Sequence, residues 1–475
     1  MTTPPPTPPA PRSLLWVGLE AVILSAVSFA VLAALARSLS PDLFGQAALA
    51  LNVVQIAASV VESLFLDAIV QRKDLSPRET AAAHTLTVLL SIAAAAAIAI
   101  GALWMGGQRD GRGAAGLMLL MAPSIVFTGA YAVPLASLRR ALALREVALL
   151  CGMARIVAGL VAVGLMASGW GAWGLVAHQN LSALLLLLAL QGRGRDVLRG
   201  WGPLAPSLVL LRFALLNSLH GLLTTNRSRL FQLMCSMAMP ARVVGQLSLA
   251  LRLVEMLAAM VVTGVARIAL VRLAELAHAG RGTARHFLSM TRQFSALATP
   301  VFVLMAALSA PLVQLVGDHG WSDAAGLVMW FALAQALRSP VHLSATLFAA
   351  HGRPQLNILI VLAELLALAL LVALLRDPLA WMWRLAVVLP LSAWFMKQVA
   401  GVAVMPLVAS VQASFVASLG MWLLVRAILP ALAGTALPVL VVLIVGGAIG
   451  VATYSALLAI TWRGVWTEMR AFARL

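Results

Sequence analysis

Charged residues are scarce in this sequence, and acidic residues are the scarcest of them. Only 10% of the 475 residues are charged, with 16 Asp and Glu against 33 Lys and Arg. A soluble domain carries about 25% charged residues, and no polar stretch here is long enough to form one. A large soluble domain is therefore excluded. The net charge of +17 would indicate a nucleic acid partner in a soluble protein, but short basic loops explain it better in a membrane protein.

Cysteines and catalytic motifs are lacking too. The two cysteines, Cys151 and Cys235, lie in apolar stretches, and their number and spacing predict neither a disulfide framework nor a metal site. The sequence has no Gly-rich phosphate loop, no HExxH or GxSxG motif and no Cys/His cluster. We therefore expect no enzymatic activity, no metal and no cofactor. Any energy source must then be an ion gradient or another protein.

Long apolar runs are what the sequence has in abundance, and its mean hydropathy is +0.99. Runs of about 18 or more apolar residues can cross a bilayer as helices, and these lack the alternation of barrel strands. The sequence predicts an all-α polytopic membrane protein with about 14 transmembrane helices. The expected spans are 14–36, 47–70, 82–105, 114–136, 147–168, 170–191, 205–235, 243–270, 292–316, 324–349, 355–375, 379–400, 408–430 and 436–462.

One stretch occurs twice and predicts an internal duplication. Gly45-Gln46 near the start returns as Gly245-Gln246, and with a one-residue gap Pro41 matches Pro240. A period of about 200 residues predicts two copies of one unit. Six spans separate the copies, so we expect two parallel six-helix lobes around a central cavity, with both glycines in short loops on the outer face. The expected domains are a disordered cytoplasmic tail 1–13, an N-lobe 14–200, a C-lobe 201–405, and two helices with a cytoplasmic tail, 406–475.

Loop charges predict the orientation in the membrane. Eighteen Lys and Arg lie at one set of helix ends and five at the opposite set. The excess predicts that the first set, and both termini, are cytoplasmic. The segment 272–292 joins the ends of two spans, and its apolar residues alternate with Arg and His. It is expected either as an amphipathic helix on the membrane surface or as a solvated loop.

Polar residues recur on one face of several predicted spans. In the span 47–70 the spacing of 0, 3, 7 and 10 relates Asn52, Gln55, Ser59 and Glu62. In the span 205–235 the same spacing relates Asn217, His220, Thr224 and Arg227. Each set therefore lies on one helix face. Such stripes predict a hydrophilic cavity; alternatively, they only join helices through hydrogen bonds. The expected cavity-lining residues are Asn52, Gln55, Ser59, Asn217, His220 and Thr224.

Charged residues inside the predicted membrane give the candidate chemistry. The guanidinium group of arginine can donate two parallel hydrogen bonds to a phosphate group. The candidates for holding a pyrophosphate are Arg212, Arg227, Arg252 and Arg155. Buried carboxylates suit ion exchange, and the candidates for ion coupling are Glu20, Glu62, Asp67 and Glu255. Basic residues near helix ends are expected to extend to the membrane surface, namely Arg267, Arg384, Lys397 and Arg426. Glu364, alone in an apolar span, is interpreted as a buried contact between helices.

Several short runs resemble the Wzx-type polysaccharide flippases. They lie in order along residues 14–360 of the sequence: Leu35-Ala36-Arg37 through Pro41-Asp42-Leu43-Phe44-Gly45, Val70-Gln71-Arg72-Lys73-Asp74-Leu75-Ser76, Leu138-Arg139-Arg140 with Leu144-Arg145, Gly169-Trp170-Gly171-Ala172-Trp173-Gly174-Leu175-Val176, then Gly317, Trp321, Ala324 and Ala325, and Gly352-Arg353. The sequence departs from many of these relatives near Arg229, where they carry an acidic residue, and at Gln246, directly after Gly245, where they carry an aromatic one.

The resemblance implies membership of the multidrug/oligosaccharidyl-lipid/polysaccharide exporter superfamily. It implies two six-helix lobes, a V-shaped cavity and alternating access in a bacterial inner membrane. The implied cargo is an undecaprenyl-pyrophosphate-linked polysaccharide repeat unit. Its sugars would contact the expected cavity-lining residues Asn52, Gln55, Ser59, Asn217, His220 and Thr224, and its lipid tail would be guided by the spans 408–430 and 436–462. A proton or sodium gradient and the polysaccharide polymerase machinery are the expected partners, and no nucleic acid is expected. The alternatives are a lipid II flippase, a multidrug cation antiporter and, least favoured because the external loops are short, a membrane glycosyl-polymerase.

Overall fold

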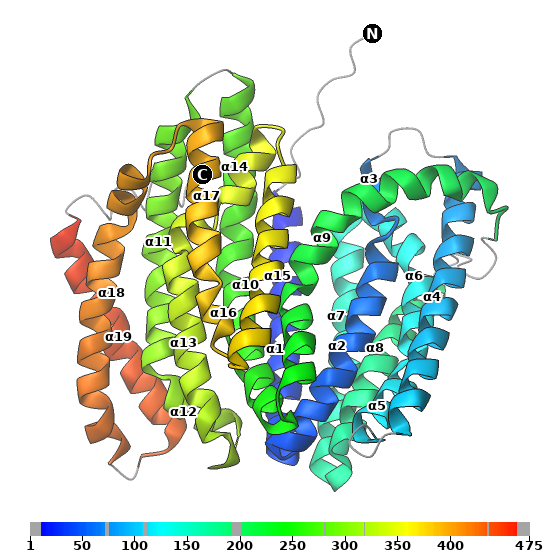
Figure 1. The fold of residues 1–475 in the computed structure, drawn as a ribbon, viewed down its shortest axis with the longest axis horizontal. Helices are drawn as coiled ribbons and strands as arrows, with labels where there is room; N and C mark the ends of the chain where they lie inside the picture. The colour runs from blue at the N-terminus through cyan, green and yellow to red at the C-terminus, as the bar shows by residue number, and fades with distance from the viewer. Residues whose placement is uncertain are drawn as a thin grey trace. The chain divides into compact units, whose positions relative to one another are not determined.

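The computed structural model describes residues 11–71, 76–107, 112–191, 201–279, 282–317, 319–434 and 437–462 (Figure 1). Throughout these ranges the regular structure is helical and contains no strand. The all-α prediction is therefore confirmed. Each of the predicted spans coincides with one helix or with two helices separated by a short break. The predicted tail lies largely outside the described residues, since 1–10 are not among them.

Within the described residues, ten helices are long and apolar enough to cross a membrane by themselves. An eleventh span is the pair α11 (Thr283–Ala307) and α12 (Ser309–Val316), which is bent by 71°. The other predicted spans correspond to α1 (Pro11–Ser38), the polar α9 (Ala205–Ala238), and the pair α16 (Ala380–Trp383) with α17 (Leu385–Ala400).

The described chain forms two compact units, and the division falls inside two helices. Unit 1 contains residues 1–39 and 46–229, and unit 2 contains residues 40–45 and 230–475. The first turn of α2 (Pro41–Ser63) thus belongs to unit 2 and the rest of that helix to unit 1. Unit 1 also contains α1 and the part of α9 up to Arg229. Its other helices are α3 (Leu66–Gln71), α4 (Pro77–Gly106), α5 (Arg112–Met121), α6 (Pro123–Arg140), α7 (Leu144–Leu165) and α8 (Ala172–Gln191).

Glycines make the tight connection between α7 and α8. The π-helical turn η1 (Met166–Trp170) contains Gly169 and is followed directly by Gly171, and their φ angles are 87° and 46°. These positive angles favour glycine, because a Cβ atom would collide with the backbone. The turn lets α7 and α8 pack directly against each other as a helical hairpin.

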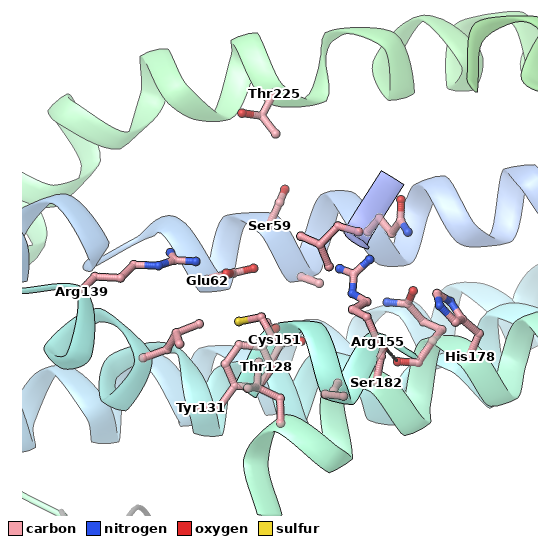
Figure 2. Close-up of a pocket in the computed structure, with 18 of the residues that line it drawn as sticks. Ser59, Glu62, Thr128, Tyr131, Arg139, Cys151, Arg155, His178, Ser182 and Thr225 are labelled. Atoms are coloured by element: carbon pink, nitrogen blue, oxygen red, sulfur yellow. Dashed lines mark hydrogen bonds between the residues drawn. The ribbon is translucent and has the colours of Figure 1, made fainter. Parts of the chain in front are cut away.

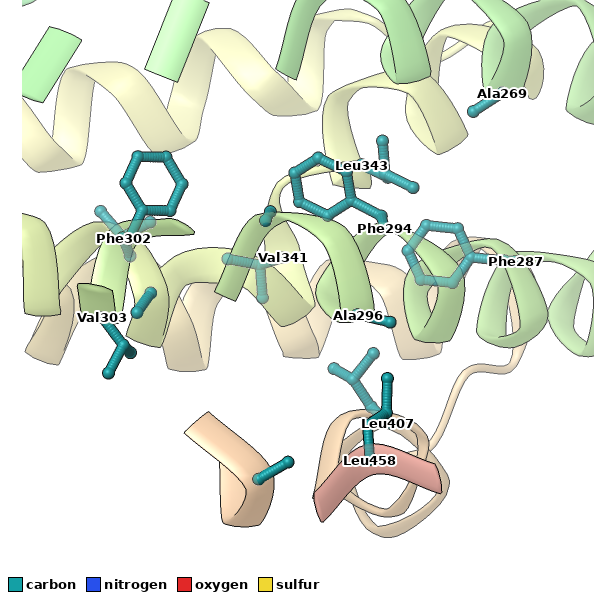
Figure 3. Close-up of a cluster of buried hydrophobic side chains, with 14 of the residues drawn as sticks. Ala269, Phe287, Phe294, Ala296, Phe302, Val303, Val341, Leu343, Leu407 and Leu458 are labelled. Atoms are coloured by element: carbon teal, nitrogen blue, oxygen red, sulfur yellow. The ribbon is translucent and has the colours of Figure 1, made fainter. Parts of the chain in front are cut away.

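Unit 2 is organised around α11. Its Phe287, Phe294 and Phe302 are fully buried and recur at seven and eight residues, so they occupy one face of the helix. They belong to a cluster that includes Leu343 and Leu407 (Figure 3). The remaining helices of unit 2 are α10 (Ala241–His278), α13 (Ser322–Arg338), α14 (Ser344–Ala350), α15 (Gln355–Leu375), α18 (Val404–Ala433) and α19 (Val439–Thr461).

Both interpretations of the segment 272–292 were wrong. Helix α10 continues to His278 and α11 begins at Thr283, so the segment is made of two helix ends. Leu273 and Phe287 are fully buried in the core of unit 2. The alternation of apolar and basic residues reflects helices that bury one face in protein, which local pattern cannot distinguish from burial in a membrane surface.

The prediction that Gly45 and Gly245 lie in loops was also wrong. Gly45 lies in the first turn or two of α2 and Gly245 at the corresponding place in α10. A methyl group on Gly45 would overlap the carbonyl oxygen of Ala241, and one on Gly245 would overlap that of Pro41. The two helix starts, all within unit 2, therefore cross at backbone contact. Glycine is needed there because nothing larger fits, and no turn is involved.

The prediction for Arg384 was wrong as well, while that for Glu364 is confirmed. Arg384 lies at the break between α16 and α17, is 1% exposed, and forms an ion pair with Glu364 of α15, which is 0% exposed. A position near a helix end thus brought the guanidinium into the protein instead of toward the membrane surface. The pair joins two neighbouring helices of unit 2.

Candidate functional cavity

Unit 1 contains a polar cavity of about 300 Å³ (Figure 2). Five helices contribute polar side chains to it: α2, α6, α7, α8 and the part of α9 that belongs to unit 1. The polar lining residues are Gln55, Ser59, Glu62, Thr128, Tyr131, Arg139, Cys151, Arg155, His178, Gln179, Ser182, Thr225 and Arg229. The volume is at the lower end of the range of small-molecule pockets, so it suits a head group better than a whole oligosaccharide.

Helical periodicity explains why these residues meet. On α6, Thr128, Tyr131 and Arg139 are spaced 0, 3 and 11, which places them on one face. On α7, Cys151 and Arg155 are one turn apart. The same four-residue spacing relates polar lining residues on α2, α8 and α9. Each helix therefore turns one polar stripe into the cavity.

The cavity is electropositive. It is lined by three arginines and one carboxylate, Glu62. Figure 2 shows Arg139 pointing toward Glu62 at one end, whereas Arg155 lies with His178 toward the other. An anion that enters the cavity would meet guanidinium groups from three different helices. Such forks bind the oxygens of phosphate groups through paired hydrogen bonds.

A hydrogen-bond network holds Arg229 in the cavity wall. Its Nε donates to Gln55 Oε1 at 3.1 Å, and its Nη1 donates to Asn226 Oδ1 at 3.0 Å. Asn226 is 3% exposed, and its Nδ2 donates to Ser59 Oγ at 2.8 Å. The network joins α2 to α9 and fixes the orientation of the guanidinium, so a ligand need not order it.

We expect Asn226→Ala to destabilise this contact between α2 and α9. It removes one of the acceptors of Arg229 and the donor to Ser59, which should lower the free energy of unfolding by about 1–2 kcal/mol. Thermal unfolding in detergent measures the effect. Ser182→Ala is the matched control, because that hydroxyl lines the same cavity but donates within its own helix, to Gln179 O. Equal midpoints for the two variants would contradict the network's role.

The structure brings together four of the residues predicted from sequence. Gln55, Ser59, Glu62 and Arg155 all line the cavity. Asn52 is buried in α2 but is not part of the lining, and on α9 Thr224 is exposed and Arg227 half-buried, also away from it. Arg252 and Glu255 are half-buried residues of unit 2. The side chains of Glu20, Asp67, Arg212, Asn217 and His220 lie outside the described residues.

Sequence reasoning missed the contribution of α6 and α8 and the place of Arg229. A search for polar residues three or four apart would have found the pair Thr128 and Tyr131 on α6. It would also have found the pair His178 and Ser182 on α8. Arg139 was counted only as a loop charge. In the described part of the chain, no group of three or more His, Cys, Asp or Glu could hold a metal ion.

Comparison with known proteins decides the family. Residues 34–326 match a family described as "Polysaccharide biosynthesis protein". The chain belongs to the polysaccharide biosynthesis protein family. The match covers both copies of the Gly-Gln repeat and all the polar lining residues of the cavity. The resemblance drawn from the short sequence runs is thereby confirmed. A search of curated proteins finds no match.

Solved structures show which fold this member of the polysaccharide biosynthesis protein family adopts. The lipid II flippase MurJ, in an inward closed conformation, matches with a TM-score of 0.75 and 11% identity, covering 96% of this chain and 99% of that one. A multidrug resistance MATE family transporter of the MOP superfamily, in an inward-facing conformation, matches with a TM-score of 0.52 and 14% identity over 82% and 95%. At such identities the likeness shows the fold alone, that of all-helical membrane transporters.

Proposed function

We propose that the protein translocates a lipid-linked polysaccharide repeat unit from the inner to the outer leaflet of a bacterial inner membrane. The cargo is an oligosaccharide attached to undecaprenyl pyrophosphate, destined for exopolysaccharide, capsule or O-antigen. The observation that carries the proposal is the electropositive cavity among the membrane helices of a polysaccharide biosynthesis protein. A positive cavity suits an anionic pyrophosphate and disfavours the cations that a multidrug antiporter carries.

The cavity suggests a role for each group in binding. Arg139, Arg155 and Arg229 contact the pyrophosphate, while Gln55 and Gln179 offer hydrogen bonds to sugar hydroxyls. Glu62 is the coupling carboxylate, because it is the acidic residue among these guanidinium groups. Arg212, Arg227 and Arg252 stay predicted contacts of the same pyrophosphate at another stage of an alternating-access cycle, with both termini cytoplasmic.

Deletion of the gene tests the proposal. We expect the oligosaccharide-pyrophosphate lipid to accumulate on the cytoplasmic side and surface polysaccharide to disappear, as measured by lipid extraction and mass spectrometry. Accumulation of lipid II instead would indicate the alternative that the likeness to MurJ favours. Normal surface polysaccharide together with altered drug resistance would overturn both.

Charge-neutral variants of the cavity test the binding role. Arg155→Gln removes one guanidinium group that would bind the pyrophosphate. The binding free energy should fall by about 1.5 kcal/mol, the value of one charged hydrogen bond, so translocation should fall about tenfold. Complementation of the deletion strain measures this as surface polysaccharide at matched expression. Arg376→Gln, an exposed arginine of unit 2 outside the cavity, serves as the control. Full activity of Arg155→Gln would contradict the assignment.

A further inference from the structure

An apolar groove lies on the outer side of the same helical hairpin that lines the polar cavity. It has a volume of about 410 Å³ and lies between α7 and α8. Its rim on α7 is formed by Leu149, Met153 and Val157, which are 39%, 64% and 43% exposed. These residues are four apart and so form one ridge along the helix. Leu185 of α8 lies opposite.

The groove and the polar cavity share part of their wall. Ala154 lines both of them. Its chain neighbour Arg155 lines only the polar cavity, and Met153 lines only the groove. The electropositive cavity and the apolar groove therefore adjoin at the Ala154 side chain. Both lie within unit 1.

This arrangement matches a molecule with an anionic head and a long apolar tail. We propose that the groove between α7 and α8 holds the proximal part of the polyprenyl chain while the pyrophosphate occupies the polar cavity. The inference rests on the proposed function and names a tail site that the sequence did not predict. It differs from the expectation that the tail is guided by the last two helices.

The position of the groove along α7 fits a cargo that starts in the cytoplasmic leaflet. Leu149–Val157 lie in the first half of the span that begins at Leu144. Basic residues at this end, such as Arg145, predict that it is cytoplasmic. The groove therefore faces the leaflet in which the loaded lipid is assembled.

The energetics make the head group the source of selectivity. Moving an apolar chain from lipid into an apolar groove gains no hydrophobic free energy, because both surroundings are hydrocarbon. The groove retains a polyprenyl chain only because the bound head holds that chain at high local concentration. Met153 can adapt its flexible side chain to the methyl branches of an isoprenoid.

Site-specific photo-crosslinking tests the proposal in the full-length protein. A photoreactive residue replaces Met153, and the protein is reconstituted into phospholipid vesicles that contain a labelled polyprenyl diphosphate. The control is the same residue at Leu160, which is 69% exposed and one turn beyond the groove on the same face. We expect about tenfold more crosslinking at 153 than at 160, reduced by unlabelled polyprenyl diphosphate but not by added phospholipid.

Coupling to the head site gives a second readout. Combining the photoreactive residue at 153 with Arg155→Gln should reduce the crosslink to the level seen at 160. Equal labelling at both positions, or labelling that Arg155→Gln leaves unchanged, would identify only bulk lipid and overturn the groove. The photoreactive residue is also placed at Val416 or Leu419, which are exposed residues of α18. Stronger crosslinking there than at 153 would overturn the groove in favour of a tail site on the last helices.

A functional variant separates this inference from the function on which it rests. Met153→Trp should fill the groove and reduce complementation, whereas Leu160→Trp should not. If the unsubstituted protein restores polysaccharide and Met153→Trp does so equally, only the groove is wrong. If the unsubstituted protein moves no lipid-linked oligosaccharide, the proposed function itself fails.

Discussion

Glu364→Leu should lower the free energy of unfolding by about 3–5 kcal/mol, because it leaves the Arg384 guanidinium buried without its counter-charge. Arg384 is 1% exposed, and two of its further contacts are local: Nε donates to Trp381 O at 2.6 Å, and the guanidinium carbon lies 3.5 Å from the centre of the Trp381 ring. Neither contact neutralises the charge. Trp381 in turn lies 5.0 Å from the ring of Phe231, so loss of the pair should loosen α9 as well.

The double variant Glu364→Leu with Arg384→Met is the decisive control. Two apolar residues of similar volume remove both the desolvation cost and the attraction, so the double variant should recover most of the lost stability. Thermal unfolding in detergent and the yield of monodisperse protein measure both proteins. If the single variant is as stable as the double one, the pair does not hold α15 against the break between α16 and α17.

Gly45→Ala should be the second strongly damaging substitution, although it adds a single methyl group. That methyl would overlap the carbonyl oxygen of Ala241, which is backbone and cannot rotate away. Overpacking of this kind costs about 1–3 kcal/mol and more when the backbone itself must move. Phe44 is fully buried with its ring 5.0 Å from Trp321, so the first turn of α2 has no free direction in which to shift.

Other glycines of the same chain give the matched control. A methyl group on Gly101 of α4 or Gly116 of α5 meets nothing within 4 Å. Alanine there should stabilise the helix by about 0.5–1 kcal/mol, the opposite sign to Gly45→Ala. Gly245→Ala should resemble Gly45→Ala, and the double variant should cost less than the sum, because both methyls force the same two helices apart. Similar unfolding midpoints for Gly45→Ala and Gly101→Ala would exclude a crossing at backbone contact.

Helical class and the approximate positions of the spans could be read from the sequence. Hydropathy is a property of each segment alone, and a bilayer leaves a buried apolar run few structures other than a helix. For the same reason the stripe of Gln55, Ser59 and Glu62 could be assigned to a cavity face, since side chains on one helix keep their angular relation wherever the helix packs. The family resemblance was also visible, because it rests on ordered short motifs.

Which stripes share a cavity could only be learned from the tertiary structure. Arg155 joins Gln55, Ser59 and Glu62, and Arg229 completes the wall through Asn226, because side chains of α2, α7 and α9 line the same cavity. No local pattern states which helices are neighbours. The breaks in α11–α12 and α16–α17 were likewise invisible to hydropathy, which averages over them.

The sequence by itself determined an all-helical membrane protein of a recognisable family, since apolar length and short ordered motifs are local properties, and it predicts an internal duplication. The structure alone decided that Gly45 and Gly245 are contact residues inside helices and that Arg384 is buried beside Glu364. Both facts depend on segments that are 20 to 200 residues apart in the chain meeting in space. A close approach or an ion pair belongs to two segments at once, and its energy appears only when both are folded.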